Sequence, residues 1–400
     1  MEWKEVTLGE ISSKIGDGLH GTPKYDDEGP YYFINGNNLN CGKIIIKDDT
    51  KRVGKDEFVK NQKELNEQTI LVSINGTIGN VAKYNNELCI LGKSACYINV
   101  IKEVDKEFIY YVLTSANFKR NITNEATGTT IKNVSLKQMR EYKFNIPCNI
   151  SDQRRIASIL SSLDRKIELN NKINADLEEM AQAIFKNWFV DFEPFKDGKF
   201  VDSELGMIPE GWKVGRLTEI ASYMNGLAMQ KFPPENNEDS LPVLKIKELG
   251  QGFCGTDSDR CSCNIKDECK IHNGDVIFSW SGTLLVDVWC GGDCGLNQHL
   301  FKVTSKDYPK WFYYYWTKHH LQEFIHIAKD KAVTMGHIKR GHLEEALVAI
   351  PDNDSMERAH ELFEPILSKM ISLRLENSRL SLLRDTLLPR LMSGELEVPE

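Results

Sequence analysis

The chain has 400 residues, of which 41% are hydrophobic and 27% charged, with a formal net charge of −8. This length predicts two or three domains with their own cores, and the composition excludes a disordered or fibrous protein. The net negative charge disfavours binding to a nucleic acid, whose phosphates are also negative. No apolar run approaches the roughly 18 residues of a membrane span, Met1–Glu5 is unlike a secretory signal, and the ten cysteines are expected to be reduced thiols in a cytoplasmic protein.

Residues 1–150 are predicted to form a first mixed α/β domain. Short β-like runs, such as Tyr31–Ile34 and Thr69–Ile74, lie between Gly/Asn turns. Residues 93–143 hold nine Lys/Arg and five Asp/Glu, a local net charge of +4. An acidic protein can thus still present a basic face to phosphates. The alternative is that these lysines are only solvated loop residues.

Residues 151–196 are predicted to form a long helix, with Ser151 and Asp152 as candidate N-cap residues. Its inward positions alternate in steps of four and three, the heptad spacing of a coiled coil. The positions are Ile156, Leu160, Leu163, Ile167, Asn170, Asn174, Leu177, Ala181, Ile184 and Trp188. The stretch Pro194–Pro209, which contains Asp197-Gly198, is predicted to be a linker into the second half.

Residues 197–350 are predicted to hold this linker and a second domain that repeats the first. Trp3 reappears as Trp212, 209 positions later, Ile70–Thr77 reappears as Val276–Thr283 after 206, and Phe108 as Phe312 after 204. A period near 205 is one domain plus a connector, which predicts a tandem pseudo-dimer with an approximate two-fold axis. Duplex DNA also has local two-fold axes. Residues 300–342 carry eight Lys/Arg against three Asp/Glu, a net +5.

Residues 351–400 are predicted to form a second heptad helix and a C-terminal tail. Pro365 predicts a kink or a late start, and Gly394 a stop. The seam positions are Ala359, Phe363, Ile366, Met370, Leu373, Asn377, Leu380, Arg384, Leu387 and Leu391. A seam Asn fixes register when it meets another Asn, so Asn377 is expected to face Asn170 or Asn174 in an antiparallel pair. The alternative is that these Asn side chains face solvent.

The predicted fold class is therefore α+β: two mixed α/β domains in tandem pseudo-two-fold repeat, separated by two long antiparallel coiled-coil helices. The strand frames are shared between the halves, but the loops differ, with ATGTTIKNV at 126–134 and DKAVTMGHI at 330–338. Shared frames suit two copies of one partner, and divergent loops suit two different short targets. This combination is what a reader of a split, asymmetric DNA sequence needs.

Candidate DNA-contacting residues follow from this comparison, because their backbone N–H groups or side chains suit phosphates or base edges. They are Gly76, Thr77, Thr129, Thr130, Lys132, Asn133, Gly282, Thr283, Gln298, His299, Thr334, His337, Lys339 and Arg340. The alternative is that each is an ordinary surface residue. Six helix residues are expected to set register and contact partners: Asn170, Asn174, Leu177, Asn377, Leu380 and Leu387.

Several motifs of other functions are incomplete. Gly250–Gly255 matches G-x-G-x-x-G but is followed by turn residues rather than a helix. Cys254, Cys261, Cys263, Cys269 and His272 lack a C-x-x-C knuckle, which leaves zinc as a minor alternative. The aromatic run Trp311–Trp316 suits core packing better than base stacking. No cofactor fingerprint or catalytic constellation is found, which favours a recognition role.

Several segments across nearly the whole chain resemble the specificity (S) subunits of Type I restriction–modification systems. They are Asp152–Ile156, Glu204–Trp212, Phe278–Thr283, Leu296–Lys302 and, most specifically, Leu383–Gly394. The resemblance implies two target-recognition domains, 1–150 and 197–350, with spacer helices 151–196 and 351–400. Each domain would read one half of a split double-stranded DNA target with a fixed gap.

The resemblance also implies the partners. The helices would recruit two methyltransferase (M) subunits, which use S-adenosylmethionine, and restriction (R) subunits would bind further out and use ATP and Mg²⁺. The chain itself would be non-catalytic and bind no cofactor or metal. Two alternatives from the residues remain: a stand-alone DNA-modifying enzyme, and a coiled-coil assembly protein without a DNA role.

Overall fold

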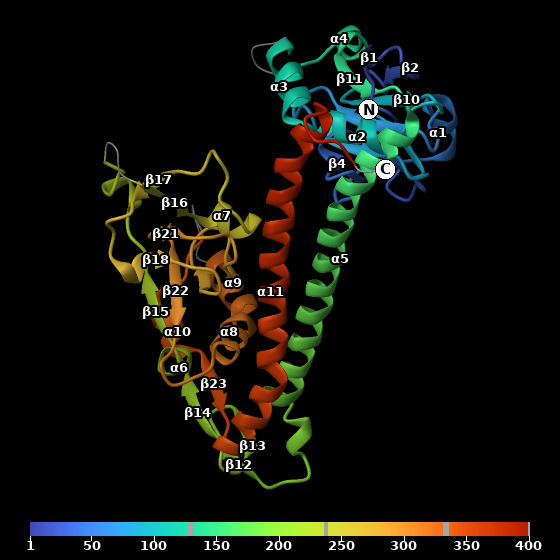
Figure 1. Cartoon of the computed structure of the whole chain (residues 1–400). Helices are drawn as coiled ribbons and strands as arrows, with labels where there is room; N and C mark the ends of the chain where they lie inside the picture. Colours follow the sequence, from blue (N-terminus) through green and yellow to red (C-terminus); the bar gives the residue numbers. More distant parts are fainter. Residues whose placement is uncertain (127–131, 236–238, 331–335, 399–400) are drawn as a thin grey trace. The chain divides into compact units, whose positions relative to one another are not determined.

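The computed structural model of the chain describes residues 1–126, 132–235, 239–330 and 336–398 (Figure 1). The chain divides into two compact units, Met1–Lys166 with Leu380–Glu400, and Ile167–Arg379. No described helix is long and apolar enough to cross a membrane. The two long helices each contribute residues to both units.

The first unit is built on a four-stranded antiparallel sheet in the order β2 (Ser12–Asp17), β10 (Ala95–Val100), β7 (Thr69–Ser73) and β8 (Val81–Lys83). Beside it are the pair β1 (Trp3–Thr7) and β11 (Lys143–Pro147), the sheet β6 (Arg52–Val53), β3 (Tyr31–Ile34) and β9 (Cys89–Leu91), and the pair β4 (Leu39–Asn40) and β5 (Lys43–Ile44). Its short helices are η1 (Gly36–Asn38), α1 (Lys55–Asn61), α2 (Lys106–Thr114), α3 (Ala116–Glu125) and α4 (Leu136–Glu141).

The second unit has the corresponding sheet in the order β15 (Ser222–Asn225), β22 (Leu300–Thr304), β19 (Val276–Ser279) and β20 (Leu285–Val288). Its other strands are the pair β14 (Lys213–Arg216) and β23 (Leu347–Ile350), and the sheet β17 (Arg260–Ser262), β16 (Ser240–Leu244), β21 (Cys294–Leu296) and β18 (Lys270–Ile271). Its short helices are α6 (Leu217–Ile220), η3 (Met229–Lys231), α7 (Ile246–Gln251), η4 (Asp267–Cys269), α8 (Lys310–His319), α9 (Leu321–Asp330) and α10 (Arg340–Glu345).

The two halves share one topology, which confirms the tandem repeat. The first, last and central strands of each domain pair in the same order. Each half also has one parallel ladder, between β3 and β9 in the first and between β16 and β21 in the second. The predicted runs at 31–34 and 69–74 correspond to β3 and β7.

Two continuous helices of 40 residues, α5 (Ile150–Phe189) and α11 (Asn353–Met392), account for the heptad patterns (Figure 1). Each is about 60 Å long at about 1.5 Å per residue. Every residue of the two predicted seams is buried or half-buried. Within the second unit, Asn170 contacts Asn377 while Phe185 contacts Phe363, so the two segments are antiparallel.

The predicted helix starts need correction. Asn149 caps α5 by accepting a hydrogen bond from the Ser151 N–H at 2.9 Å, so Ser151 and Asp152 lie inside the first turn. Asp352 caps α11 in the same way, through the Ser355 N–H at 2.8 Å. The predicted late start at Pro365 is wrong, because α11 already begins at Asn353.

Aromatic side chains form the core of the second unit. The run Trp311–Trp316 of α8 is buried, which confirms core packing over base stacking. Phe363 of α11 stacks on Trp311 with 4.7 Å between ring centroids. The predicted linker is also part of this core: it folds into η2 (Glu193–Phe195) and the hairpin β12 (Phe200–Ser203) and β13 (Gly206–Pro209), and Phe195 packs edge-on against Trp212 at 5.0 Å. Its apolar residues explain why it is ordered.

Candidate nucleic-acid interface

Each half exposes one glycine turn at the end of a central strand. Gly76 and Thr77 follow β7, and Gly282 and Thr283 follow β19 at the corresponding place. Both glycines have positive φ, +74° and +64°, a conformation that residues with a Cβ avoid. All four residues are exposed. Because the two glycines carry no side chain, a ligand can approach the backbone of each turn closely.

Backbone hydrogen bonds join each glycine turn to the loop before the last short helix of the same half, which is α4 in the first half and α10 in the second. The Gly76 N–H donates to the Lys132 carbonyl at 3.1 Å, and the Gly282 N–H donates to the Gly336 carbonyl at 3.0 Å. The bridges Asn75–Asn133 and Ser281–His337 complete the same frame. Two segments predicted separately from the sequence thus form one surface in each half. Thr129, Thr130 and Thr334 lie outside the described residues.

In the first half, this surface carries amide and lysine side chains. The Asn75 Nδ2 donates to the Asn133 Oδ1 at 3.2 Å. Lys132 and Lys93 are exposed and form no ion pair within the described part of the chain. Ser94, next to Lys93, donates to the Asn35 Oδ1 at 3.0 Å. The charge of the two lysines is therefore available to a phosphate.

In the second half, the same positions carry aromatic and imidazole side chains. His299 and His337 lie on Trp280, with ring centroids 5.9 and 6.4 Å apart, and both are exposed. The Ser281 Oγ and the His299 Nδ1 share a hydrogen bond at 3.1 Å. Gln298 is the neighbour of His299, at 3.4 Å between their Nε2 atoms. Trp280 and Ser281 were not among the candidates predicted from the sequence, although both interrupt the repeat where the first half has Ile74 and Asn75.

A recess of 520 Å³ adjoins Gln298 and His299. Its remaining lining residues are Met229, Gln230, Val243, Lys245, Asp259, Arg260 and Asn297. Lys245 and Asp259 form an ion pair, and the Arg260 Nε donates to the Ser240 Oγ at 3.0 Å. The Oε1 of Gln298 is buried and has no hydrogen-bond partner among the described residues. This recess could not be predicted from sequence patterns, because its residues are far apart in the chain.

Lys339 and Arg340 lie at the start of α10, close after His337. Both side chains are exposed, and neither forms an ion pair with a described residue. The Lys339 N–H donates to the His342 Nδ1 at 3.1 Å and so caps the helix. The capped start of α10 thus places both cationic residues at the edge of the surface that carries His337.

The cysteines of the segment 254–294 are free thiols, several of which contact one another or apolar side chains. Within the described ranges, no group of three or more His, Cys, Asp or Glu side chains is arranged to hold a metal ion. A hydrogen bond between the thiols of Cys254 and Cys294, followed by burial, raises the pKa of Cys294. Cys261 and Cys269 pack in an apolar cluster, and His272 pairs with Asp293 at 2.8 Å. The G-x-G-x-x-G run lies at the end of α7 rather than at the start of a helix.

The helix residues predicted to set the register come together as polar contacts between α5 and α11. Asn170 Nδ2 donates to Asn377 Oδ1 at 2.9 Å and to Glu376 Oε2 at 2.9 Å. Asn377 Nδ2 donates in turn to Asn171 Oδ1 at 2.8 Å. The predicted facing of Asn377 and Asn170 is confirmed, and the solvent-facing alternative is wrong for Asn170 and Asn174, which are buried.

The leucines predicted beside these Asn residues have less specific surroundings. Leu177 and Leu380 are half-buried in the seam. Leu387 packs against the core of the first unit, near the buried Leu391. Leu169, Leu382 and Leu383 are exposed on the outer faces of the two helices. Leu382 and Leu383 are neighbours in the chain, whereas Leu169 is a single exposed leucine of a kind that is ordinary on a protein surface.

Comparison with known proteins identifies one family. The family model described as "Type I restriction modification DNA specificity domain" matches residues 1–179 and 209–374. The chain is 28% identical to the Type I restriction enzyme MjaIX specificity subunit of Methanocaldococcus jannaschii, over 95% of this chain and 87% of that protein. It is 22% identical to the HindI specificity subunit of Haemophilus influenzae, over 99% of this chain and 100% of that protein.

A solved structure supports the same fold. The S subunit of a Type I restriction–modification system from M. genitalium superposes with a TM-score of 0.55 at 18% identity, covering 98% of this chain and 96% of that chain. The double match of the family model and the similar fold confirm both the tandem repeat and the resemblance that the motifs indicated. The relatives are named specificity subunits, which agrees with the expected non-catalytic role.

Proposed function

Because this chain belongs to the family of Type I restriction modification DNA specificity domains, we propose that each of its halves reads one part of a split DNA target. One observation carries the proposal. The same backbone frame presents Lys93, Ser94 and Asn133 in the first half and Gln298, His299 and His337 in the second. An identical frame with different side chains gives two readers of different base sequences.

The proposed roles follow from the chemistry of DNA. Lys93, Lys132, Lys339 and Arg340 are exposed cations that suit phosphates, and the exposed turns at Gly76 and Gly282 leave room for the DNA backbone to approach. The amides and imidazoles suit base edges in the major groove. The buried, unpartnered Oε1 of Gln298 supports a polar ligand here, because a buried acceptor without a hydrogen bond costs about 1–3 kcal/mol.

The proposed partners are two methyltransferase subunits and, further out, restriction subunits, in the cytoplasm. The neighbouring Leu382 and Leu383 of α11 are exposed apolar side chains that such a partner would cover. S-adenosylmethionine, ATP and Mg²⁺ would be bound by these partners rather than by this chain. The helices would act as a spacer that sets the gap between the two half-sites.

Salt-dependent binding of the assembled complex tests this function. Affinity for a duplex that carries the target should fall steeply as salt rises, because bound phosphates release counterions. A duplex with one half-site scrambled should bind at least tenfold more weakly at the same salt. Equal affinity for both duplexes would contradict sequence reading, and absent or salt-insensitive binding would favour an assembly protein without a DNA role. Methylation or cleavage by the chain alone would favour a stand-alone enzyme.

A further inference from the structure

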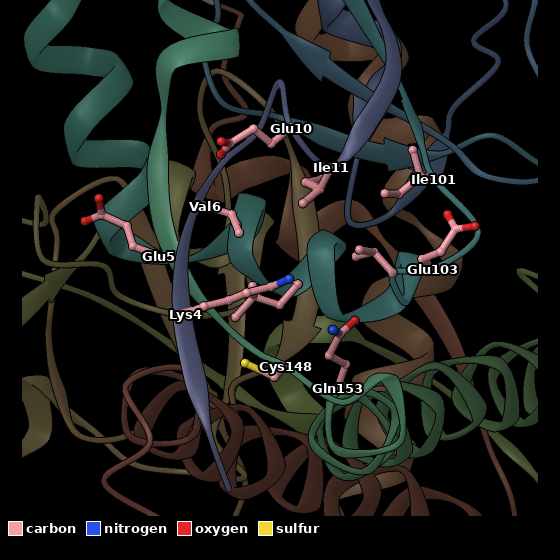
Figure 2. A pocket seen from close by; sticks show the side chains of 11 residues that line it. Lys4, Glu5, Val6, Glu10, Ile11, Ile101, Glu103, Cys148 and Gln153 are labelled. Atoms are coloured by element: carbon pink, nitrogen blue, oxygen red, sulfur yellow. The ribbon is translucent and has the colours of Figure 1, made fainter.

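A recess of 470 Å³ opens in the first unit, where β1, β11 and the start of α5 meet (Figure 2). Four apolar side chains form its floor and are at most 9% exposed: Val6, Ile11, Val104 and Ile146. The other lining residues are Lys4, Glu5, Glu10, Ile101, Glu103, Cys148 and Gln153. None of them belongs to the proposed DNA-reading surface.

The rim of the recess is acidic. Glu5 forms an ion pair with Lys143 at 3.0 Å. The remaining charged residues that line the recess are two carboxylates, Glu10 and Glu103, and one cation, Lys4. Hydrogen bonds from the Thr7 N–H and hydroxyl hold the pKa of Glu10 below its usual value. Glu103 is exposed and has no ion-pair partner among the described residues. A phosphate backbone would be repelled here, whereas a cationic side chain would be attracted.

In the second half, the side chain of Tyr308 occupies the position that corresponds to this recess. Tyr308 lies two residues before α8, as Val104 lies two residues before α2. Its ring stacks on Phe312 with 5.4 Å between centroids. Burial raises the pKa of Tyr308, and the charges of Asp307 and Glu219 add to the effect; Glu219 is the counterpart of Glu10. The recess of the first half is thus the place where this ring is missing.

We propose that the recess is a docking site for a lysine or arginine side chain of a methyltransferase subunit. The aliphatic stem of such a residue would cover the floor of Val6, Ile11 and Val104, and its cationic head would reach Glu10 and Glu103. The acidic rim carries the choice of a cationic partner group, and Gln153 of α5, which accepts a hydrogen bond from the Asp105 N–H at 2.9 Å, places the recess at the N-terminal end of this long helix. The inference rests on the proposed recruitment of methyltransferase subunits.

Cysteine footprinting tests the docking site in the assembled complex. Cys148 lines the recess and is exposed, and Cys41, exposed in the β4–β5 turn, is an internal control. Alkylation by iodoacetamide, followed by mass spectrometry, should slow at least fivefold at Cys148 when methyltransferase subunits are bound and stay unchanged at Cys41. Equal rates at Cys148 in the free and bound chain would overturn the docking site while leaving recruitment intact. Failure of the subunits to bind at all would overturn both.

A substitution copied from the second half provides an independent test. Val104→Tyr should fill the recess as Tyr308 does and weaken methyltransferase binding at least tenfold, with an unchanged melting temperature. Glu103→Lys should weaken it by repulsion, and Lys102→Glu, an exposed change beside the recess, should not. Unchanged binding by folded Val104→Tyr and Glu103→Lys chains would exclude the recess as the docking site.

Discussion

Asn170 of α5 donates a hydrogen bond to Asn377 of α11, with 2.9 Å between Nδ2 and Oδ1. Asn170 is fully buried, so its amide depends on this contact and on Glu376. A buried polar pair of this kind favours one register of two helices over its neighbours, because a shift would leave both amides unpaired. The pair therefore fixes the alignment of the two helices where they meet.

Asn377→Leu should lower the free energy of unfolding by about 1–3 kcal/mol, because it removes a partner of a buried amide. Urea unfolding followed by helical circular dichroism measures this change. Lys172→Leu, which adds the same side chain at an exposed position of α5, should stay within about 0.5 kcal/mol of wild type. Similar values for both variants would show that the Asn pair does not stabilise the helix pair.

Tyr142 should make the protein less stable at high pH. Its side chain is buried against Phe118, and burial raises its pKa from 10.0 to about 12. Since the folded-state pKa is the higher one, its contribution is complete below pH 10 and is lost as pH rises through 12. A shift of this size corresponds to about 3 kcal/mol.

Urea unfolding at a series of pH values between 8 and 12 checks this expectation. Tyr142→Phe should flatten the loss of stability, since it keeps the ring and removes the ionisable hydroxyl. Tyr25→Phe is the matched control, because Tyr25 is exposed. A pH dependence that is the same in Tyr142→Phe and wild type would exclude Tyr142 as its source.

Arg340→Ala should affect only one half of the recognised sequence. Arg340 belongs to the second half, at the start of α10 beside the surface of His299 and His337. A lost base contact should cost about 1–3 kcal/mol and relax one position, whereas a lost phosphate contact should weaken all sequences evenly. Mapping of methylated sites in cells distinguishes the two. Lys306→Ala, an exposed residue of the same domain, is the control; an unchanged motif and unchanged methylation in Arg340→Ala would remove Arg340 from the reading set.

Longer helices should lengthen the gap between the half-sites. Because Asn170 is paired with Asn377, an insertion in α5 alone would shift the register, so four residues must be added to both α5 and α11. One added turn lengthens the spacer by about 6 Å, or about two base pairs. Motif mapping of this double insertion measures the gap. Full activity with the original gap would refute the spacer role.

The periodic features of this chain could be predicted from its sequence because they depend on local spacing. The two heptad seams, at 156–188 in α5 and at 359–391 in α11, are buried or half-buried at every predicted position. The strands at 31–34 and 69–74 were also evident, since short β-like runs between Gly/Asn turns are a local signal. The cap at Asn149 was missed because Ser151 and Asp152 offer the same chemistry two positions later.

The proposed recognition surface could be predicted only in part, because it is assembled by long-range pairing. Gly76 and Lys132 were separate candidates, and the backbone hydrogen bond that joins them connects positions far apart in the chain. The grouping of Trp280 with His299 and His337, and the recess with Lys245 and Asp259, likewise depend on sheet register that no local pattern encodes. The internal repeat was the most useful sequence signal, both for the fold and for the candidate residues of this surface.

Whether this chain specifies a split DNA target is tested most directly by mapping methylated motifs in DNA from cells that carry the chain with its methyltransferase subunit, compared with cells that lack the chain. We expect one new motif made of two different half-sites separated by a fixed gap. If no new motif appears although the methyltransferase is expressed and bound, the chain does not specify a split DNA target.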